Sequence, residues 1–259
     1  MKVKCVLATA VVTSIIIGGL TGCVSQTTES LLVYSGAGMR KPMDEIGEIF
    51  HSKYGVEVSY NYAGSNALLS QMELAKRGDV YMPAETFYIE IAAEKGYVDY
   101  QKPVAYHIPV ITVPKGNPAN IRTLDDLARP GLRIIWGDPN IAAIGRLGVK
   151  ILQKNGIEEE VWANVITVTP TMSELILYTA MGQCDATVNW GDVVKYEPDI
   201  EIIEIPKEQN IIEVIPIGTL VFSENTGTAR DFVDFCSSDE GKVIFSKYGF
   251  PAYPDSNYE

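Results

Sequence analysis

The stretch Leu31-Leu32-Val33-Tyr34-Ser35-Gly36-Ala37-Gly38 has the pattern of a short apolar strand that runs into a glycine-rich turn. A helical pattern follows, with Pro42 in a position that suits a first helical turn and Gly55 at its end. A strand that passes through a small-residue turn into a helix is the repeating unit of a parallel α/β sheet. This stretch therefore predicts an α/β protein.

Strand and helix patterns alternate from there to the end of the chain. The predicted strands cover residues 56–62, 79–82, 106–113, 132–136, 165–168, 186–189, 200–203 and 214–222. The predicted helices cover residues 86–95, 124–128, 143–155, 173–181, 228–235 and 240–248, and a further helix opens at residues 64–66 and ends at Gly78. Because so many alternating elements exceed one ordinary core, we expect two α/β lobes.

The N-terminal segment has the pattern of a secretory signal. Two lysines precede an apolar run over residues 6–17, which is too short for a membrane-spanning helix. The run ends in Leu20-Thr21-Gly22-Cys23, which resembles the lipidation box of secreted lipoproteins. We therefore expect a signal peptide over residues 1–22, lipidation of Cys23, a polar tether over residues 23–30, and an extracytoplasmic protein that the lipid alone anchors to the membrane. A plain secretory signal with a chance cysteine is the alternative.

Acidic residues outnumber basic residues in this chain. The formal charge is −12, and removal of the two signal lysines takes it to −14, with 33 acids against 19 bases. Nucleic acid is therefore not an expected partner, because its binding depends on basic surface. A site for an anionic ligand would have to be built locally, from backbone N–H groups, hydroxyls and helix N-termini.

The cysteines and histidines give little sign of a metal or cofactor. Apart from the signal and anchor cysteines, only Cys184 and Cys236 remain, each in a segment with a buried pattern. We expect two free thiols, and a disulfide is the alternative that an external location permits. With no CxxC pair and only His51 and His107, the sequence does not support a zinc site, and we expect no cofactor.

Four predicted strand-to-helix turns share small or hydroxyl-bearing residues. They are Gly36-Ala37-Gly38-Met39, Gly64-Ser65-Asn66, Ala142-Ala143-Ile144-Gly145 and Thr169-Pro170-Thr171-Met172. In a parallel sheet such turns lie at the carboxyl ends of the strands, where ligands bind. Each helix start offers free N–H donors and a partial positive charge, so several together would bind a dianion without a lysine. For any single turn, an ordinary helix cap is the alternative.

Motifs of enzymes and nucleotide-binding proteins are weak or missing. Gly36-x-Gly38 begins like a dinucleotide fingerprint, but Lys41 stands where its third glycine belongs. The sequence has no GxSxG elbow, no P-loop and no HExxH motif. The acidic pair Asp125-Asp126 is expected to be a solvated face, and the carboxylate of Glu85 would repel an oxyanion at close range. A secreted enzyme remains an alternative that would need a nucleophile–base pair.

The order of these motifs resembles the periplasmic molybdate/tungstate-binding proteins of ABC importers. The resemblance rests on residues 33–39 (VYSGAGM), 62–68 (YAGSNAL), 78–85 (GDVYMPAE), 137–145 (GDP…G), 186–189 (ATVN) and the closing stretch 232–251. It implies a two-lobed type II periplasmic-binding-protein fold, with two hinge strands and a ligand cleft between the lobes. Lobe 1 would be residues 31–107 plus 215–259, and lobe 2 residues 108–214, with the hinge strands near residues 106–110 and 214–217.

The resemblance also implies a function without catalysis. The chain would be a monomeric solute-binding lipoprotein that captures molybdate or tungstate and delivers it to an ABC permease with its ATPase. Family members bind the oxyanion with hydroxyl and backbone N–H groups. The matching positions here are Gly38, Ser65, Ile144, Met172 and Asn189, and Met39, Arg40, Asn66 and Glu85 are candidates for further contacts.

Two of these positions depart from the family pattern. Gly38 stands where the family has a serine, so either Arg40 or Lys41 supplies a charged donor there or the pocket is larger. Asn189 replaces a tyrosine and still offers an amide donor. These departures leave open another oxyanion or a small organic anion as the ligand. The choice between molybdate and tungstate, and between a transport and a sensory binding lipoprotein, also stays open.

Overall fold

The computed structural model describes residues 29–258. The predicted signal segment, Cys23 and most of the tether lie outside this range. No helix within residues 29–258 is long and apolar enough to cross a membrane.

Lobe 1 is built on a five-stranded mixed sheet with the order β2-β1-β3-β10-β4. Its strands are β1 (Ser30–Gly36), β2 (Glu57–Ala63), β3 (Val80–Met82), β4 (Val98–His107) and β10 (Glu213–Leu220). β1 pairs with β2 and β3 in parallel, whereas β10 runs antiparallel to β3 and β4. The turns after the parallel strands therefore lie at one edge of the sheet, as expected.

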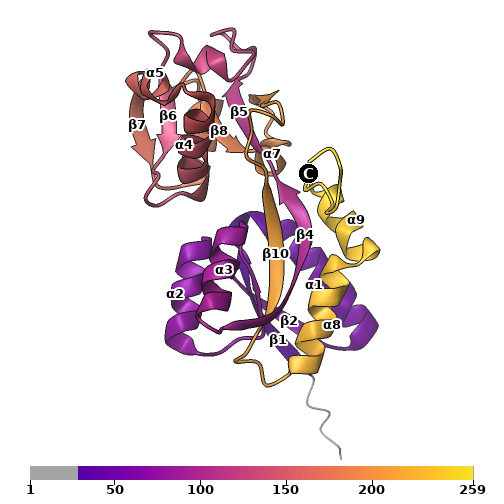
Figure 1. Cartoon of the computed structure of the whole chain (residues 1–259). Coiled ribbons are helices and arrows are strands. Elements are labelled where there is room, and N and C mark those ends of the chain that lie inside the picture. The colour runs from indigo at the N-terminus through magenta and orange to yellow at the C-terminus, as the bar shows by residue number, and fades with distance from the viewer. Residues whose placement is uncertain (1–28, 259) are drawn as a thin grey trace, which may run out of the picture.

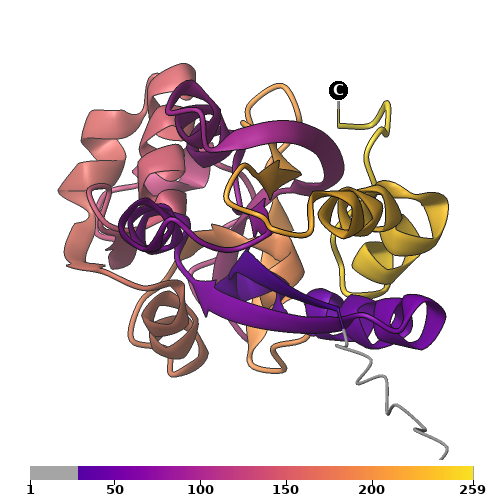
Figure 2. The ribbon, with the colours of Figure 1, turned by 90° about the horizontal axis from the view of Figure 1, so that it is seen from below.

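Helices cover both faces of this sheet. They are α1 (Arg40–Tyr54), α2 (Ser65–Ala75), α3 (Thr86–Glu94), α8 (Thr226–Ser237) and α9 (Asp239–Lys247), with a short 3₁₀ turn η1 (Ala37–Met39) before α1. Figures 1 and 2 show α2 and α3 on one side of the strands and α1, α8 and α9 on the other. Two apolar clusters fill these interfaces, one around Phe50 and Phe232 and the other around Leu68 and Tyr81.

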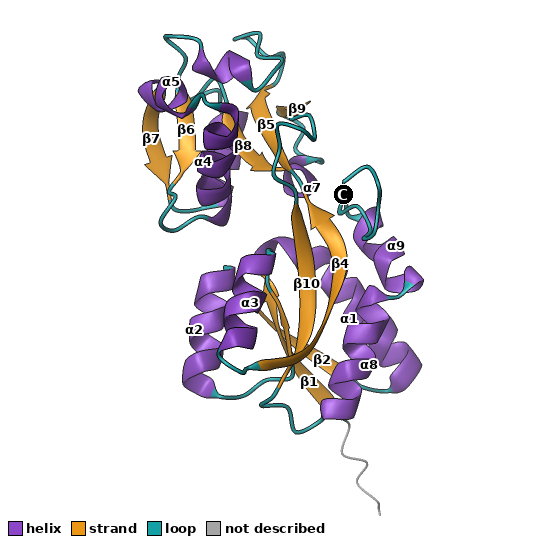
Figure 3. Cartoon of the chain, in the orientation of Figure 1, coloured by secondary structure: helices purple, strands orange, loops and turns teal. Residues whose placement is uncertain are grey.

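Lobe 2 repeats the plan on a smaller scale (Figure 3). Its strands are β5 (Pro109–Pro114), β6 (Ile134–Gly137), β7 (Val165–Thr169), β8 (Thr187–Trp190) and β9 (Ile200–Glu204). Its helices are α4 (Ala143–Asn155), α5 (Glu158–Ala163), α6 (Met172–Ala180) and α7 (Gly191–Val194), with a 3₁₀ turn η2 (Asp125–Ala128). A parallel bridge between Ile134 and Ala186 joins the pair β6-β7 to the sheet β8-β5-β9. The lobe has its own apolar core around Trp136.

Two chain crossings connect the lobes. β4 passes directly into β5 at Ile108, and residues 205–212 return the chain from β9 to β10. The single strand expected over residues 106–113 is thus divided at Ile108. Residues 214–217, expected as the second hinge strand, lie within β10, whose first residue Glu213 pairs with His107 at the end of β4. The second crossing therefore reaches lobe 1 beside the first one. The limits 31–107 plus 215–259 and 108–214 for the lobes remain our proposal.

The two cysteines of the described region are free and buried, and they belong to different cores. Cys236 lies in the lobe 1 cluster and Cys184 in the lobe 2 core. Burial raises the pKa of both thiols above the ordinary value. The expectation of two free core thiols is confirmed.

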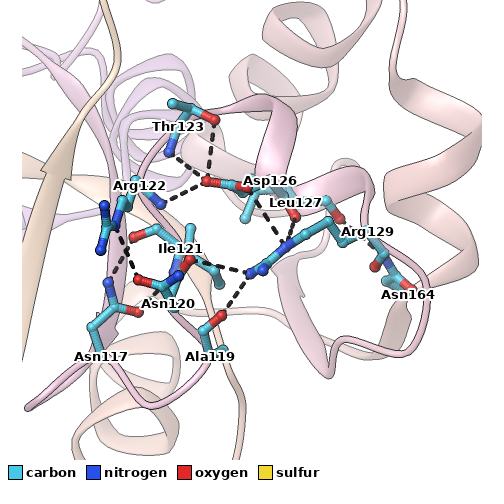
Figure 4. Close-up of polar contacts among 10 residues, drawn as sticks. All are labelled: Asn117, Ala119, Asn120, Ile121, Arg122, Thr123, Asp126, Leu127, Arg129 and Asn164. Carbon is cyan, nitrogen blue, oxygen red and sulfur yellow. Dashed lines mark hydrogen bonds and ion pairs between the residues drawn. The ribbon is translucent and has the colours of Figure 1, made fainter.

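The loop before η2 corrects one expectation about acidic residues. Asp126, expected to be part of a solvated face, is half-buried and accepts hydrogen bonds from the backbone N–H groups of Arg122 (2.8 Å) and Thr123 (3.0 Å), as Figure 4 shows. These donors, the Arg122 N–H first, hold the pKa of Asp126 below its ordinary value although desolvation opposes them. Arg129 completes the loop by donating to the Ala119 carbonyl at 2.6 Å. Asp126 is therefore a structural cap in lobe 2.

Candidate functional site

A cleft between the lobes brings the four predicted turns together. The cavity measures about 350 Å³, and its wall includes residues 36–39, 63–65, 142–144 and 170–173. The first two segments belong to lobe 1 and the last two to lobe 2. A ligand in this cleft would therefore contact both lobes.

Three helices of nine or more residues begin at the cleft wall. They are α2 at Ser65, α4 at Ala143 and α6 at Met172. The N–H groups in the first turn of a helix have no acceptor within that helix, which leaves donors at Ile144 and Met172. The helix dipoles add partial positive charge at the same place. The wall is therefore suited to an anion.

The start of α4 is set by a close approach of two glycines. A Cβ atom on Gly145 would lie 2.1 Å from the carbonyl oxygen of Gly137, which is the last residue of β6. Only glycine fits at this distance. The contact holds the first turn of α4, with Ile144, at the end of the strand and at the cleft.

Ser65 has a hydroxyl that is oriented by the protein and still able to donate. The residue is only 7% exposed, and its Oγ accepts a hydrogen bond from the Ala84 N–H at 3.1 Å. The Tyr81 hydroxyl donates to the Ser65 carbonyl at 3.0 Å and fixes the backbone. Because a hydroxyl can accept and donate at once, the Ser65 hydrogen remains available to a ligand in the cleft.

Asn189 lies in β8, is fully buried and does not line the cleft, although the next residue, Trp190, does. Its Oδ1 accepts a hydrogen bond from the Trp190 N–H at 3.0 Å. This bond fixes the orientation of the side-chain amide, so that the Nδ2 donor group points the other way. Nδ2 has no acceptor among the described residues. A buried amide donor without a partner costs about 1–3 kcal/mol, so it is a candidate donor to a ligand.

Of the remaining candidates for ligand contacts, some line the cleft and others lie outside it. Gly38 and Met39 line the cleft, and a Cβ atom on Gly38 would lie 3.6 Å from Val193 of lobe 2. Asn66 is exposed to solvent and is not among the described residues that line the cleft. Arg40 is also outside it, with its guanidinium 4.1 Å from the centre of the Tyr62 ring. Arg40 therefore does not replace the missing serine hydroxyl in this conformation.

Glu85, the last candidate, forms an ion pair with a residue of the other lobe. It is 3% exposed, and both of its carboxylate oxygens lie 3.1 Å from the same guanidinium nitrogen of Arg146 in α4. The Arg146 guanidinium also lies 5.4 Å from the Phe87 ring centre. Since Arg146 compensates its charge, Glu85 does not confront an anion as a bare carboxylate.

The remaining part of the cleft wall was not predicted from the sequence. Trp190, Val193 and Phe250 contribute apolar surface, and His107 is the one ionisable side chain among the described wall residues. His107 is 3% exposed and stacks on Trp190 with 3.7 Å between ring centres. No group of three or more His, Cys, Asp or Glu side chains in residues 29–258 could hold a metal ion.

Comparison with known proteins agrees with this architecture. Residues 31–251 match the family model of bacterial extracellular solute-binding proteins. The chain belongs to this family. The relatives described below are binding proteins, several of them of transporters, which supports a role without catalysis.

Several relatives share nearly the whole length of this solute-binding protein. The molybdate-binding protein ModA of Mycobacterium tuberculosis is 26% identical over 258 residues, which cover 94% of this chain and 97% of the relative. The substrate-binding lipoprotein YvgL of Bacillus subtilis, a putative ABC transporter component, is 22% identical over 88% of each chain. The resemblance to molybdate-binding proteins that the sequence predicted is confirmed.

Solved structures show the same fold. The substrate-binding domain of a putative molybdenum ABC transporter from Clostridium difficile has a TM-score of 0.73 at 18% identity, covering 86% of this chain and 98% of that one. The sulfate-binding protein SubI of Mycobacterium tuberculosis has a TM-score of 0.76 at 18% identity and covers 89% of each chain. The predicted two-lobed type II periplasmic-binding-protein fold is thus confirmed.

Proposed function

We propose that this solute-binding protein captures a tetrahedral oxyanion, molybdate or tungstate, between its lobes and delivers it to the permease of an ABC importer. The observation that carries the proposal is the set of helix starts and turns from both lobes that open onto one cleft. The relatives that bind molybdate, and the neighbour that binds sulfate, support an oxyanion as the ligand.

Closure of the lobes would couple binding to delivery. Donors from Ser65 in lobe 1 and from Ile144 and Met172 in lobe 2 reach one anion only when the lobes are together. The ligand therefore stabilises the closed state, which a permease can recognise. Several charge-assisted hydrogen bonds must replace the water shell of the anion, since its dehydration is costly.

A titration of the chain without its signal segment tests this proposal. Calorimetry with molybdate, tungstate, sulfate and phosphate should give tight one-to-one binding of the first two and weak binding of the others. Ser65→Ala should weaken molybdate binding by about ten- to a hundredfold, because one charge-assisted hydrogen bond is lost. An unchanged affinity would remove Ser65 from the site.

A small organic anion, or another oxyanion, is the second candidate for the ligand. The cleft of about 350 Å³ is far larger than the ~30 Å³ share of a water molecule, and the missing hydroxyl at Gly38 enlarges the space. The apolar surface of Trp190 and Phe250 would suit a carbon skeleton. Absence of binding to all four inorganic anions would favour this candidate.

We also propose that Cys23 carries the lipid that holds the protein, as a monomer, at the outer face of the membrane. The lipidation box in the sequence supports this, and the relative YvgL is named a lipoprotein. Cys23→Ala should release the protein from the membrane fraction. Retention of the variant there would rule out lipid anchoring through Cys23. Transport rather than sensing would be tested by uptake of labelled molybdate in cells that lack the gene.

A further inference from the structure

His107 occupies a position between the lobes that the proposed anion site does not yet use. It is the last residue of β4 and lines the cleft, while its stacking partner Trp190 is the last residue of β8 in lobe 2. The two rings are nearly parallel, at 17° to one another. Asp192 of α7 lies on the other side of the imidazole, also from lobe 2.

Both ring nitrogens of His107 face acceptors. Nδ1 lies 3.3 Å from the carbonyl oxygen of Ala84, which can only accept, so Nδ1 carries a hydrogen. Nε2 lies 3.1 Å from Oδ1 of Asp192. This distance is that of an ion pair, but the imidazole and the carboxylate are not aligned for a hydrogen bond. Neither carboxylate oxygen of Asp192 accepts a hydrogen bond from any other described residue.

The contact between His107 and Asp192 requires a proton. Asp192 is 7% exposed, so water does not screen its charge. A neutral imidazole with its hydrogen on Nδ1 would aim a lone pair at a buried carboxylate from 3.1 Å, which is repulsive. A second hydrogen, on Nε2, would turn this repulsion into the attraction of an ion pair.

We propose that His107 is an imidazolium that supplies the positive charge of the ligand cleft, and that Asp192 holds it in this state. The inference rests on the proposed function only in naming the ligand as an anion. None of the described residues that line the cleft is a lysine or an arginine. Asp192 does not line the cleft but lines a separate cavity of about 800 Å³ behind the hinge. The positive end of the pair is therefore the end that faces the ligand.

The charged groups around His107 favour this protonation state. Glu213 is its direct neighbour across β10, and Glu85 follows Ala84, whose carbonyl the imidazole contacts. The guanidinium of Arg146 forms an ion pair with Glu85, and the positive charge of Lys150 partly offsets the negative charge of Glu213. With Asp192 added, acids exceed bases around the ring by one, and the face of Trp190 also attracts a cation.

The proposal predicts that anion binding depends on pH through His107. A bound dianion favours the protonated ring, so binding is tightest at low pH and weakens as the pH rises and the free protein loses this proton. Molybdate titrations between about pH 5 and about pH 9 should show a fall in affinity of about tenfold. His107→Gln, which is neutral at every pH, should bind about tenfold more weakly at low pH and show no such fall.

His51→Gln is the matched control, because His51 is the only other histidine and its side chain is 48% exposed. This variant should follow the parent protein across the whole range. A pH dependence that persists in His107→Gln would overturn the proposal.

The charge of His107 can be read without any ligand. Nitrogen-15 NMR of the ligand-free protein should show two protonated ring nitrogens for His107 at neutral pH, and Asp192→Asn should abolish this signature. A neutral ring in the parent protein would overturn the proposal. Absence of anion binding together with a charged ring would instead refute the proposed function, so the two failures are distinguishable.

Discussion

One guanidinium nitrogen of Arg146 lies 3.1 Å from each carboxylate oxygen of Glu85, and the two residues belong to opposite lobes. Glu85 immediately precedes α3 in lobe 1, and Arg146 lies in α4 of lobe 2. With the glutamate side chain 4% exposed and the arginine side chain 28% exposed, the pair is largely removed from water. The ion pair therefore links the lobes directly beside the cleft.

Removal of this link should weaken ligand binding without touching the cleft wall. Arg146→Met leaves the buried Glu85 carboxylate without its partner, which disfavours the closed state. We expect about tenfold weaker molybdate binding, measured by calorimetry. The double variant with Glu85→Gln should regain part of the loss, since neither charge is then left alone.

The matched control is an ion pair within lobe 2. Arg133 and Asp185 lie 2.7 Å apart and do not join the lobes. Arg133→Met should leave the affinity for molybdate unchanged. A loss equal to that of Arg146→Met would mean that the effect comes from lobe 2 stability and not from closure.

Restoring the family serine should tighten oxyanion binding. A side chain at Gly38 has room, because its Cβ atom would lie in ordinary contact with Val193 at 3.6 Å. Gly38→Ser adds a hydroxyl donor at the cleft and should strengthen molybdate binding about tenfold. Gly38→Ala, which adds bulk without a donor, should give no gain. Weaker binding in both variants would show that the ligand fills the space at Gly38.

Reversal of the polarity at Asn189 should abolish binding. Asn189→Asp keeps the acceptor for the Trp190 N–H and replaces the unpartnered Nδ2 donor by an oxygen. A carboxylate there repels a dianion, so we expect affinity to fall by at least about a hundredfold. Thermal unfolding would confirm that the variant is folded, and Asn189→Ala should lose about tenfold. Parent-like affinity of the folded Asp variant would exclude Asn189 from the site.

Glu213 gives a pH dependence of stability. Its pKa is raised above the ordinary value, first by burial and then by the charge of Glu85. Folding therefore favours the protonated carboxyl, and stability is lost as the pH rises through the raised value. Glu213→Gln should increase the melting temperature at neutral pH by about 2–4 °C, and the difference should vanish below about pH 4, where folded and unfolded chains are both protonated. An equal gain at both pH values would point to packing instead of charge.

The regular helices and the turns at their starts could be predicted because local residues specify them. α1 ends at Gly55, which has the left-handed conformation (φ 72°) that glycine adopts without strain, and the sequence placed the end of this helix there. The four small-residue turns were recognised for the same reason, and the structure brings all four to one cleft. The turns that follow parallel strands lie together at the carboxyl ends of those strands, and this can be inferred without knowing which distant residues are in contact.

Features set by distant contacts could not be predicted. The first part of β4 went unrecognised because polar residues and Pro103 interrupt its apolar pattern, and because its partner β10 lies far away in the sequence. α7 has four residues, too few to show a helical period. The pairs Glu85–Arg146 and His107–Asp192 join residues far apart in sequence, so neither partner indicates the other.

Crystallography of the protein with bound tungstate would locate the ligand, since tungsten scatters anomalously and marks its own position. We expect one strong anomalous peak in the interlobe cleft, within hydrogen-bond reach of the Ser65 hydroxyl and of the N–H groups of Ile144 and Met172. A peak in the cavity behind the hinge, or only at surface lysines, would contradict binding of the oxyanion between the lobes.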